Sequence, residues 1–156
     1  MKDLRARGKK AMNDLIDVRK RVLFVCVENS NRSQMAEAFV KKHARERVEA
    51  LSAGSRPSGK VNPRAKQFMA EKGYDLGSHS SKSLESFNGT EFDVAVTMGC
   101  GDNCPLVNAK RREEWNIPDP KEMSDDGFRE VRDLIERQVV QLVTTLCISG
   151  TPARCS

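Results

Sequence analysis

The sequence predicts a single α/β domain in which an open parallel sheet carries helices on both faces. Three observations lead to this prediction. Apolar, β-branched runs that are typical of buried strands alternate with segments whose apolar residues recur at helical spacing. The chain has 156 residues, which suits one domain. Hydrophobic residues make up 38% and charged residues 31%, a composition that is normal for a soluble protein with one core. Such alternation favours parallel strands joined by helices.

The first half of the chain supplies two of the expected strands and one helix. Residues 21–27 form a continuous apolar and β-branched run, which is typical of a strand buried on both faces. A polar turn at 28–31 follows, and a helix is expected to begin near residue 32. Its apolar positions recur at helical spacing, at Met35, Ala36, Phe39 and Val40. Residues 48–53 form a second short strand.

The second half begins with a clear helix start. Asn62 and Pro63 suit the N-cap and first-turn positions, and Gly73 suits the end of that helix. Residues 80–87 are expected to form a short helix and residues 92–98 a third strand. A long amphipathic helix near the C-terminus is indicated by apolar residues at helical spacing, namely Val131, Leu134, Ile135, Val139, Leu142, Val143 and Leu146.

The charge distribution divides the chain into three expected segments. Residues 1–21 hold eight of the 27 Lys and Arg and three of the 22 Asp and Glu, so the rest holds 19 of each sign. We therefore expect a basic extension at 1–20, a domain at 21–150 and a tail at 151–156. A basic nucleic-acid face is not indicated. No apolar run suits a membrane span or a secretory signal, so a cytoplasmic location is expected. The chain is also expected to be a monomer.

The sharpest feature is a loop between the first strand and its helix. Cys26 ends the strand, and Arg32 opens the helix after five intervening residues. A loop of this length can direct its N–H groups at one anion, and the helix N-terminus adds its positive end. The predicted oxyanion-binding residues are Val27, Glu28, Asn29, Ser30, Asn31, Arg32 and Ser33. The Cys26 sulfur is expected beneath the anion as an activated thiolate. A buried strand cysteine with an unrelated surface arginine is the alternative.

With these residues, the chain resembles the low-molecular-weight phosphatase superfamily, and specifically its arsenate reductase branch. The resemblance covers roughly residues 21–147. It rests on short segments, namely 22–26, 29–30, 32–37, 52–54, 62–63, 79–82, 96–98, 103–105, Trp115 and 119–120. Phosphatases of this fold usually carry proline after Arg-Ser, whereas Gln34 stands here, as in the reductases. The resemblance implies a four-stranded sheet of order 2-1-3-4.

The resemblance also implies a reaction. Cys26 attacks bound arsenate, and Asp119, the aspartate of Asp-Pro, acts as the general acid. Cys100 then attacks Cys26 to release arsenite, and Cys104 resolves the disulfide. No cofactor is expected to be bound, and the electrons come from an external thiol reductant. That reductant is thioredoxin, or glutathione or mycothiol with a glutaredoxin-type protein.

Some features of the residues leave alternatives open. Asp119 lies between two prolines, and from the sequence alone it can equally cap a turn. Only three residues separate Cys100 from Cys104, fewer than is usual, so a small thiol could replace one internal cysteine. Cys147 is expected to pack as a small apolar residue, and Cys155 lies in the tail.

Metal and cation sites are not expected. Five cysteines, an odd number, argue against a disulfide framework, and two thiols alone do not make a zinc site. Some reductases of the resembling branch bind potassium through matches to Asn29, Glu37 and Ser52. Lys82 replaces the remaining acidic ligand here, so no potassium requirement is expected. Glu28 stands where many relatives have glycine, and its carboxylate is expected to point away from the anion.

Two other functions compete with arsenate reduction. A phosphatase acting on phosphotyrosine or small phosphoesters would use the same loop and Asp119 but would not need Cys100. A non-catalytic oxyanion or redox sensor would bind through the loop without turnover. The presence of both Asp119 and Cys100 argues against the sensor.

Overall fold

The computed structural model describes residues 19–99 and 107–149, with the side chains of 147–149 left aside. In this part of the chain four parallel strands form one sheet of order β2-β1-β3-β4. The strands are β1 (Lys20–Cys26), β2 (Val48–Gly54), β3 (Phe92–Thr97) and β4 (Ala109–Glu114). The α/β class and the predicted strand order are therefore confirmed.

The strand register brings the carboxyl ends of β1, β2 and β3 to one edge of the sheet. Cys26 lies opposite Gly54 on β2, and Val25 lies opposite Thr97 on β3. The N–H of Met98 donates to the carbonyl oxygen of Val25 at 2.8 Å, so the chain leaving β3 stays beside the end of β1. Ligands of open α/β sheets bind beyond this edge.

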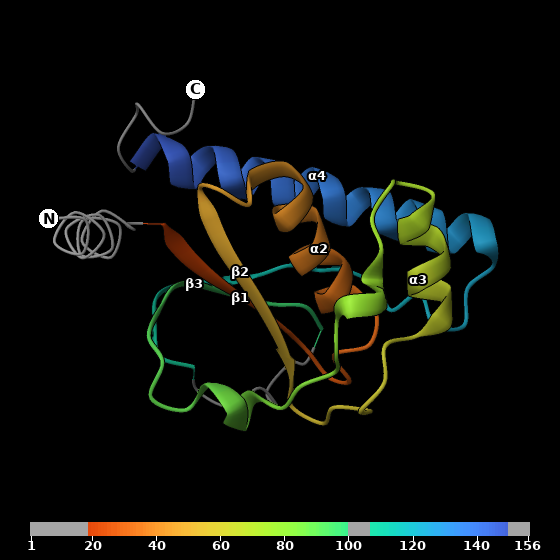
Figure 1. The fold of residues 1–156 in the computed structure, drawn as a ribbon, viewed down its shortest axis with the longest axis horizontal. Helices are drawn as coiled ribbons and strands as arrows, with labels where there is room; N and C mark the ends of the chain where they lie inside the picture. The colour runs from red at the N-terminus through yellow and green to blue at the C-terminus, as the bar shows by residue number, and fades with distance from the viewer. Residues whose placement is uncertain (1–18, 100–106, 150–156) are drawn as a thin grey trace, which may run out of the picture.

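In the described residues, three α-helices and two short 3-10 helices surround the sheet. They are α2 (Arg32–Ala44), α3 (Pro63–Ala70), α4 (Asp125–Ser149), η1 (Leu76–Ser78) and η2 (Leu84–Phe87). Figure 1 shows the three α-helices together on one side of the sheet and the green η2 turn on the other. Helical turns thus lie on both sides, but one of these two layers is a single 3-10 turn.

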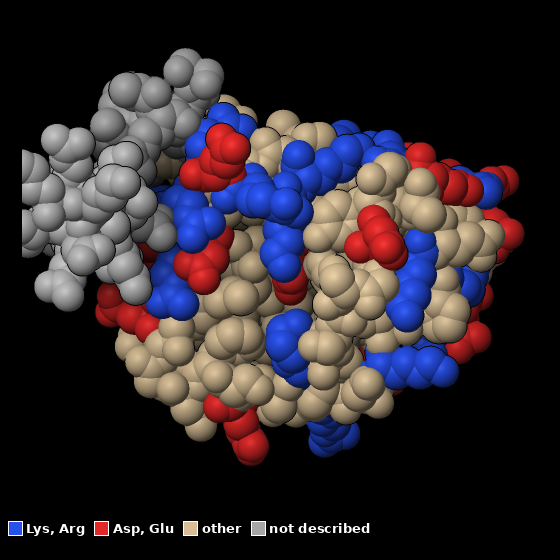
Figure 2. Space-filling view, in the orientation of Figure 1, with Lys and Arg blue, Asp and Glu red and all other residues tan. Residues whose placement is uncertain are grey.

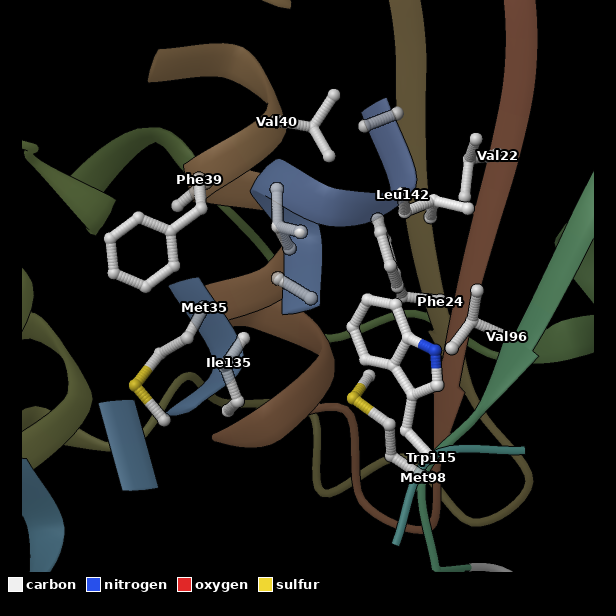
Figure 3. Packing of buried hydrophobic residues seen from close by; sticks show 14 of the residues in the cluster. Val22, Phe24, Met35, Phe39, Val40, Val96, Met98, Trp115, Ile135 and Leu142 are labelled. Atoms are coloured by element: carbon white, nitrogen blue, oxygen red, sulfur yellow. The ribbon is translucent and has the colours of Figure 1, made fainter. Parts of the chain in front are cut away.

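The larger part of the core lies between the sheet and helices α2 and α4. Figure 3 shows Val22, Phe24 and Val96 of the sheet directed toward side chains of these two helices. The rings of Phe24 and Trp115 lie 5.7 Å apart between centroids. Burial of each large apolar side chain stabilises the fold by about 1.5–3 kcal/mol. This packing holds β1 rigidly up to its last residue.

Alternate residues of β1 face opposite layers. Leu23 and Val25 belong to a second, smaller cluster that includes Leu84 of η2 and Phe92 of β3. Cys26 follows Val22 and Phe24 on the α-helical face. The period of two in a strand therefore fixes the side of the sheet on which the cysteine lies.

The predicted elements agree with the structure with two differences. The side chain of Asn62 accepts from the N–H of Arg64 at 2.8 Å, as expected of an N-cap. The helix expected over residues 80–87 is only the 3-10 turn at its end, η2. Strand β4 was not located from its own residues, because Ala-Lys-Arg-Arg-Glu-Glu lacks the apolar pattern of a strand. It is the outermost strand of the described sheet, and its side chains are mostly exposed.

No helix in residues 19–99 or 107–149 combines the length and apolar character that crossing a bilayer requires. Figure 2 shows blue Lys and Arg side chains across one face of the molecule, with red Asp and Glu side chains among them. Charges of both signs are thus mixed on this face. The expected absence of a nucleic-acid partner stays a prediction.

Candidate active site

The loop between β1 and α2 is shaped by two backbone features. Asn29 has a φ of 51°, in the left-handed region that asparagine tolerates better than most residues. Gly54 allows β2 to approach this loop closely. A Cβ atom at Gly54 would lie 2.5 Å from the Val27 carbonyl oxygen and 2.9 Å from the Asn29 nitrogen. Glycine is therefore required at Gly54 by contact with the loop.

The carbonyl groups of the loop are held by an outer segment, residues 55–62. Four of them accept main-chain hydrogen bonds of 2.8–3.2 Å from this segment: Cys26 from Ser55, Val27 from Arg56, Glu28 from Ser58 and Ser30 from Asn62. In a planar trans peptide the N–H points opposite to the carbonyl. The N–H groups of residues 27, 28, 29 and 31 therefore point away from the outer segment. Several N–H groups turned to one side of a loop create a concave site that suits an anion.

A pocket of about 370 Å³ opens on this side of the loop. Its lining residues are Cys26, Val27, Glu28, Ser30, Asn31, Arg32, Gly99, Asp119 and Lys121. Exposure divides them into a floor and a rim. Cys26 is only 2% exposed and lies on the floor. The side chains of Glu28, Asp119 and Lys121 are 42%, 49% and 50% exposed, and we call these three residues the rim.

A chain of hydrogen bonds reaches the sulfur of Cys26. The Ser33 hydroxyl oxygen lies 2.8 Å from Cys26 Sγ and accepts from Asn29 Nδ2, also at 2.8 Å. Because Asn29 supplies a hydrogen to Ser33, the hydroxyl is free to donate its own hydrogen to the sulfur. Such a donor can stabilise negative charge that forms on the sulfur. Ser33 also lies in the first turn of α2, at the positive end of the helix.

Gln34 holds the loop from behind, and sequence reasoning missed this role. Its side chain is fully buried. The Nε2 group lies 2.9–3.0 Å from three oxygens, Asn29 O, Asn29 Oδ1 and Ser80 O. Its two hydrogens are thus shared among three acceptors. The sequence did carry a signal for it. Gln34 directly precedes the apolar residues of the expected helix, and a buried side-chain amide needs hydrogen-bond partners.

His79 completes this support. Its Nδ1 lies 3.0 Å from Gln34 Oε1, and its Nε2 lies 2.8 Å from the Tyr74 hydroxyl. Burial lowers the pKa of His79 below its usual value, although the Glu37 carboxylate 3.5 Å away opposes this. In a neutral ring, Nδ1–H donates to Gln34 while Nε2 accepts from Tyr74. Every polar atom of this cluster is then paired.

Arg32 lies between the loop and the segment that carries Asp119. Its Nη1 donates to the Ile117 carbonyl oxygen at 3.1 Å, and its Nη2 lies 3.8 Å from Asp119 Oδ2. Gly99, with a φ of 80°, leaves room for the guanidinium, and a Cβ atom there would collide with Arg32 Nη1. The structure thus connects the guanidinium to the segments on both sides of the pocket.

Asp119 has two different environments at its two oxygens. Oδ1 accepts from the N–H of Lys121 at 3.0 Å, which is the turn-capping contact that the sequence left open. Oδ2 faces Arg32 across 3.8 Å at the rim. One carboxylate therefore caps its own turn and also borders the pocket.

The structure brings Cys26, Arg32 and Asp119 around one pocket. Cys100, Cys104 and Cys155, together with the side chain of Cys147, lie outside the described residues. Gly99 lines the pocket and directly precedes Cys100 in the sequence. In the described ranges, no group of three or more His, Cys, Asp or Glu residues is placed to hold a metal ion.

The buried carboxylate of Glu37 lies behind the loop. Glu37 is one of the residues discussed above as a match to potassium ligands. Glu37 accepts from the Ser52 hydroxyl and from Lys41 Nζ, each at 2.6 Å. Lys82 Nζ lies 4.0 Å from Glu37 Oε1, and burial lowers the pKa of this amine. Two ammonium groups thus already flank the carboxylate. The expectation of potassium independence rests on this arrangement and stays a prediction.

The part of the chain that carries these features is similar in sequence to known proteins. Residues 21–149 match the family model described as low molecular weight phosphotyrosine protein phosphatase. The chain is 37% identical over 130 residues to a glutaredoxin arsenate reductase of Synechocystis sp., covering 81% of this chain and 98% of the relative.

The chain is also similar to solved structures of arsenate reductases. A structure described as an arsenate reductase in the phosphate binding state has a TM-score of 0.75 and 37% identity, with 81% and 98% of the two chains covered. A thioredoxin-dependent arsenate reductase of Corynebacterium glutamicum has a TM-score of 0.73 and 28% identity. That match covers 90% of this chain and 68% of the other.

Proposed function

Because this chain belongs to the low molecular weight phosphotyrosine protein phosphatase family, we propose that its pocket binds arsenate and reduces it to arsenite. One observation carries the proposal. A buried cysteine, bonded to a serine hydroxyl, lies on the floor of a pocket toward which loop N–H groups and an arginine converge. Relatives that share 37% and 28% identity with the chain are arsenate reductases.

Binding of the oxyanion follows from the donors around the pocket. The N–H groups of residues 27–33 surround three of its oxygens, and the Arg32 guanidinium, with its remaining N–H groups, contacts them from the side. Charge-assisted hydrogen bonds of this kind are about twice as strong as neutral ones. The fourth oxygen faces the rim, opposite the sulfur of Cys26.

The first chemical step is a displacement at arsenic. The Cys26 thiolate forms a sulfur–arsenic bond while the bond from arsenic to the outward oxygen breaks. Asp119 donates a proton to that oxygen, so that water leaves instead of hydroxide. Arsenic is still As(V) in this adduct. The exposed carboxylate of Asp119 can regain its proton from solvent.

The second step transfers the electrons. The thiolate of Cys100 attacks the sulfur of Cys26, a disulfide forms, and the electron pair of the sulfur–arsenic bond stays on arsenic. Arsenite, As(III), leaves, and the two thiols have lost the two electrons that arsenic gained. Cys100 is one peptide bond from Gly99, a residue of the pocket lining.

The third step regenerates the nucleophile. Cys104 attacks the sulfur of Cys100, which releases Cys26 as a thiolate and forms a Cys100–Cys104 disulfide. An external dithiol or glutathione then reduces this disulfide. The relatives include a glutaredoxin arsenate reductase and a thioredoxin-dependent one, so both classes of reductant enter the test.

The test measures two reactions on the same variants. Arsenite formation is followed with thioredoxin and its reductase, and separately with glutathione and glutaredoxin, while p-nitrophenyl phosphate reports ester hydrolysis. Cys26→Ser should lose both activities. Cys100→Ser should lose arsenite formation and keep the weak ester hydrolysis expected of the wild type, and Cys155→Ser serves as the matched thiol control.

Other outcomes favour other functions. Arsenite formation by Cys100→Ser at the wild-type rate would remove the proposed relay. Ester hydrolysis without any arsenite formation in the wild type would make the chain a phosphatase. Oxyanion binding with neither reaction would indicate a sensor.

A further inference from the structure

We propose that the Glu28–Lys121 ion pair is a specificity element that closes the mouth of the pocket against phosphoesters and admits free inorganic oxyanions. This inference rests on the proposed oxyanion site and adds to it a substrate class. It concerns two rim residues that the reaction steps do not use through their side chains.

The pair spans two separate segments. Glu28 belongs to the loop after β1, and Lys121 follows Asp119 in the segment before α4. Lys121 Nζ lies 3.5 Å from Glu28 Oε1, and the Ser30 hydroxyl donates to Glu28 Oε2 at 3.4 Å. The carboxylate is thus held over the outer side of the pocket by contacts at both of its oxygens.

The pair contributes little to stability, because both side chains are about half exposed. Its position is the important property. In an in-line displacement by Cys26, the departing group lies opposite the sulfur, toward the rim. From arsenate this group is one oxygen, which leaves as water. From a phosphoester it is an oxygen that carries an organic group, and that group must occupy the space next to Glu28 and Lys121.

The chemical character of the residues that line the pocket also favours inorganic oxyanions over phosphoesters. Among the described residues that line the pocket none is aromatic, and the longest apolar side chain among them is that of Val27. Sites for organic ligands are lined mainly by apolar and aromatic side chains. Here an aryl group would instead meet a carboxylate and an ammonium ion that it must separate or desolvate. Discrimination of this type comes from an unfavourable contact with the wrong substrate.

The test compares two anions that differ in one substituent on phosphorus, which is an oxygen in one and a phenyl group in the other. Inorganic phosphate and phenylphosphonate, whose carbon–phosphorus bond resists hydrolysis, are titrated as protectants of Cys26 against iodoacetamide, with modification read by peptide mass spectrometry. Wild-type protein should require much more phenylphosphonate than phosphate. Glu28→Ala should lower that concentration ratio by up to about fivefold, because the phenyl group no longer has to separate an exposed ion pair.

Three further variants sharpen the result. Lys121→Ala leaves Glu28 unpaired at the mouth and should weaken protection by both anions. The exchange Glu28→Lys with Lys121→Glu rebuilds the bridge and should restore a ratio near that of the wild type. Glu122→Ala removes a neighbouring exposed charge that does not line the pocket, and it should leave the ratio unchanged.

An unchanged ratio in Glu28→Ala, or an exchange variant that behaves like Glu28→Ala, would overturn the proposal. Because protection does not depend on turnover, this result is separate from the proposed function. Protection by phosphate without arsenite formation would reject the reductase and leave the selectivity test intact. In the active enzyme, Glu28→Ala should also raise kcat/KM for p-nitrophenyl phosphate relative to that for arsenate.

Discussion

Replacing Ser33 by alanine removes the hydrogen bond that reaches the sulfur of Cys26. The hydroxyl lies 2.8 Å from Sγ, so the lost contact is short and, with a thiolate, charge-assisted. A hydrogen bond to a charged group contributes about 1.5–3 kcal/mol. Since about 1.4 kcal/mol corresponds to a tenfold change, the rate of Cys26 alkylation should fall by about 10- to 100-fold.

The assay is the rate of Cys26 alkylation by iodoacetamide, followed by peptide mass spectrometry at several pH values, because the thiolate is the form that is alkylated. Ser52→Ala is the matched control. Ser52 is as fully buried as Ser33, but its hydroxyl donates to Glu37 at 2.6 Å and does not contact Cys26. Ser33→Ala should react slowly and Ser52→Ala at the wild-type rate.

Two results would refute this reasoning. Ser33→Ala could react as fast as the wild type, which would mean that the hydroxyl does not stabilise the thiolate. Alternatively, both serine variants could slow equally, which would point to general loosening of the fold. Ser33→Ala also leaves Asn29 Nδ2 without its acceptor, so a loss of stability of about 1–3 kcal/mol should accompany the slower alkylation.

Three further predictions follow from the site. Gly99→Ala places a Cβ against the Arg32 guanidinium and forces alanine into the left-handed region, a strain that costs about 1–2 kcal/mol. Phosphate should therefore protect Cys26 at least about tenfold less well than in the wild type, and equal protection would contradict this. Burial lowers the pKa of His79 in the folded protein, so the unfolded chain binds a proton on this ring more readily. The contribution of neutral His79 to the stability of the fold is therefore complete above about pH 6.5 and is lost as the pH falls toward the folded-state pKa. Urea unfolding of His79→Gln between about pH 7 and 5 should show a smaller decline than the wild type, and an equal decline would exclude the linkage. Turnover should be the same in potassium and sodium chloride because Lys82 lies 4.0 Å from Glu37, and a strong increase in potassium would show that this ammonium does not replace a cation.

Local signals in the sequence were sufficient for much of the fold. The strand ending at Cys26 is continuous in apolar residues, and Asn62 with Pro63 defines a helix start without reference to any distant residue. The loop between Cys26 and Arg32 was recognisable for the same reason, because its chemistry depends on spacing within one short segment. The roles of these residues stay predictions until the proposed variants are measured.

Several contacts between distant parts of the chain were not predicted, although the resemblance did supply the strand order. Glu28 and Lys121 are 93 residues apart, and Gln34 and His79 are 45 apart, so no local pattern indicates that they meet. Gly99 has a role only because the fold brings Arg32 against it. The resemblance to a family did not supply the Glu28–Lys121 pair either.

Strand β4 has a consequence for the behaviour of the protein at high concentration. An outermost strand presents unpaired N–H and carbonyl groups, to which a strand of another copy can add. Five of its six residues are charged, and Arg111 and Glu113 pair along its exposed surface. A second copy approaching this edge would have to bury or separate these charges. The charges that deprive β4 of the apolar pattern of a strand thus oppose the addition of another strand at this edge.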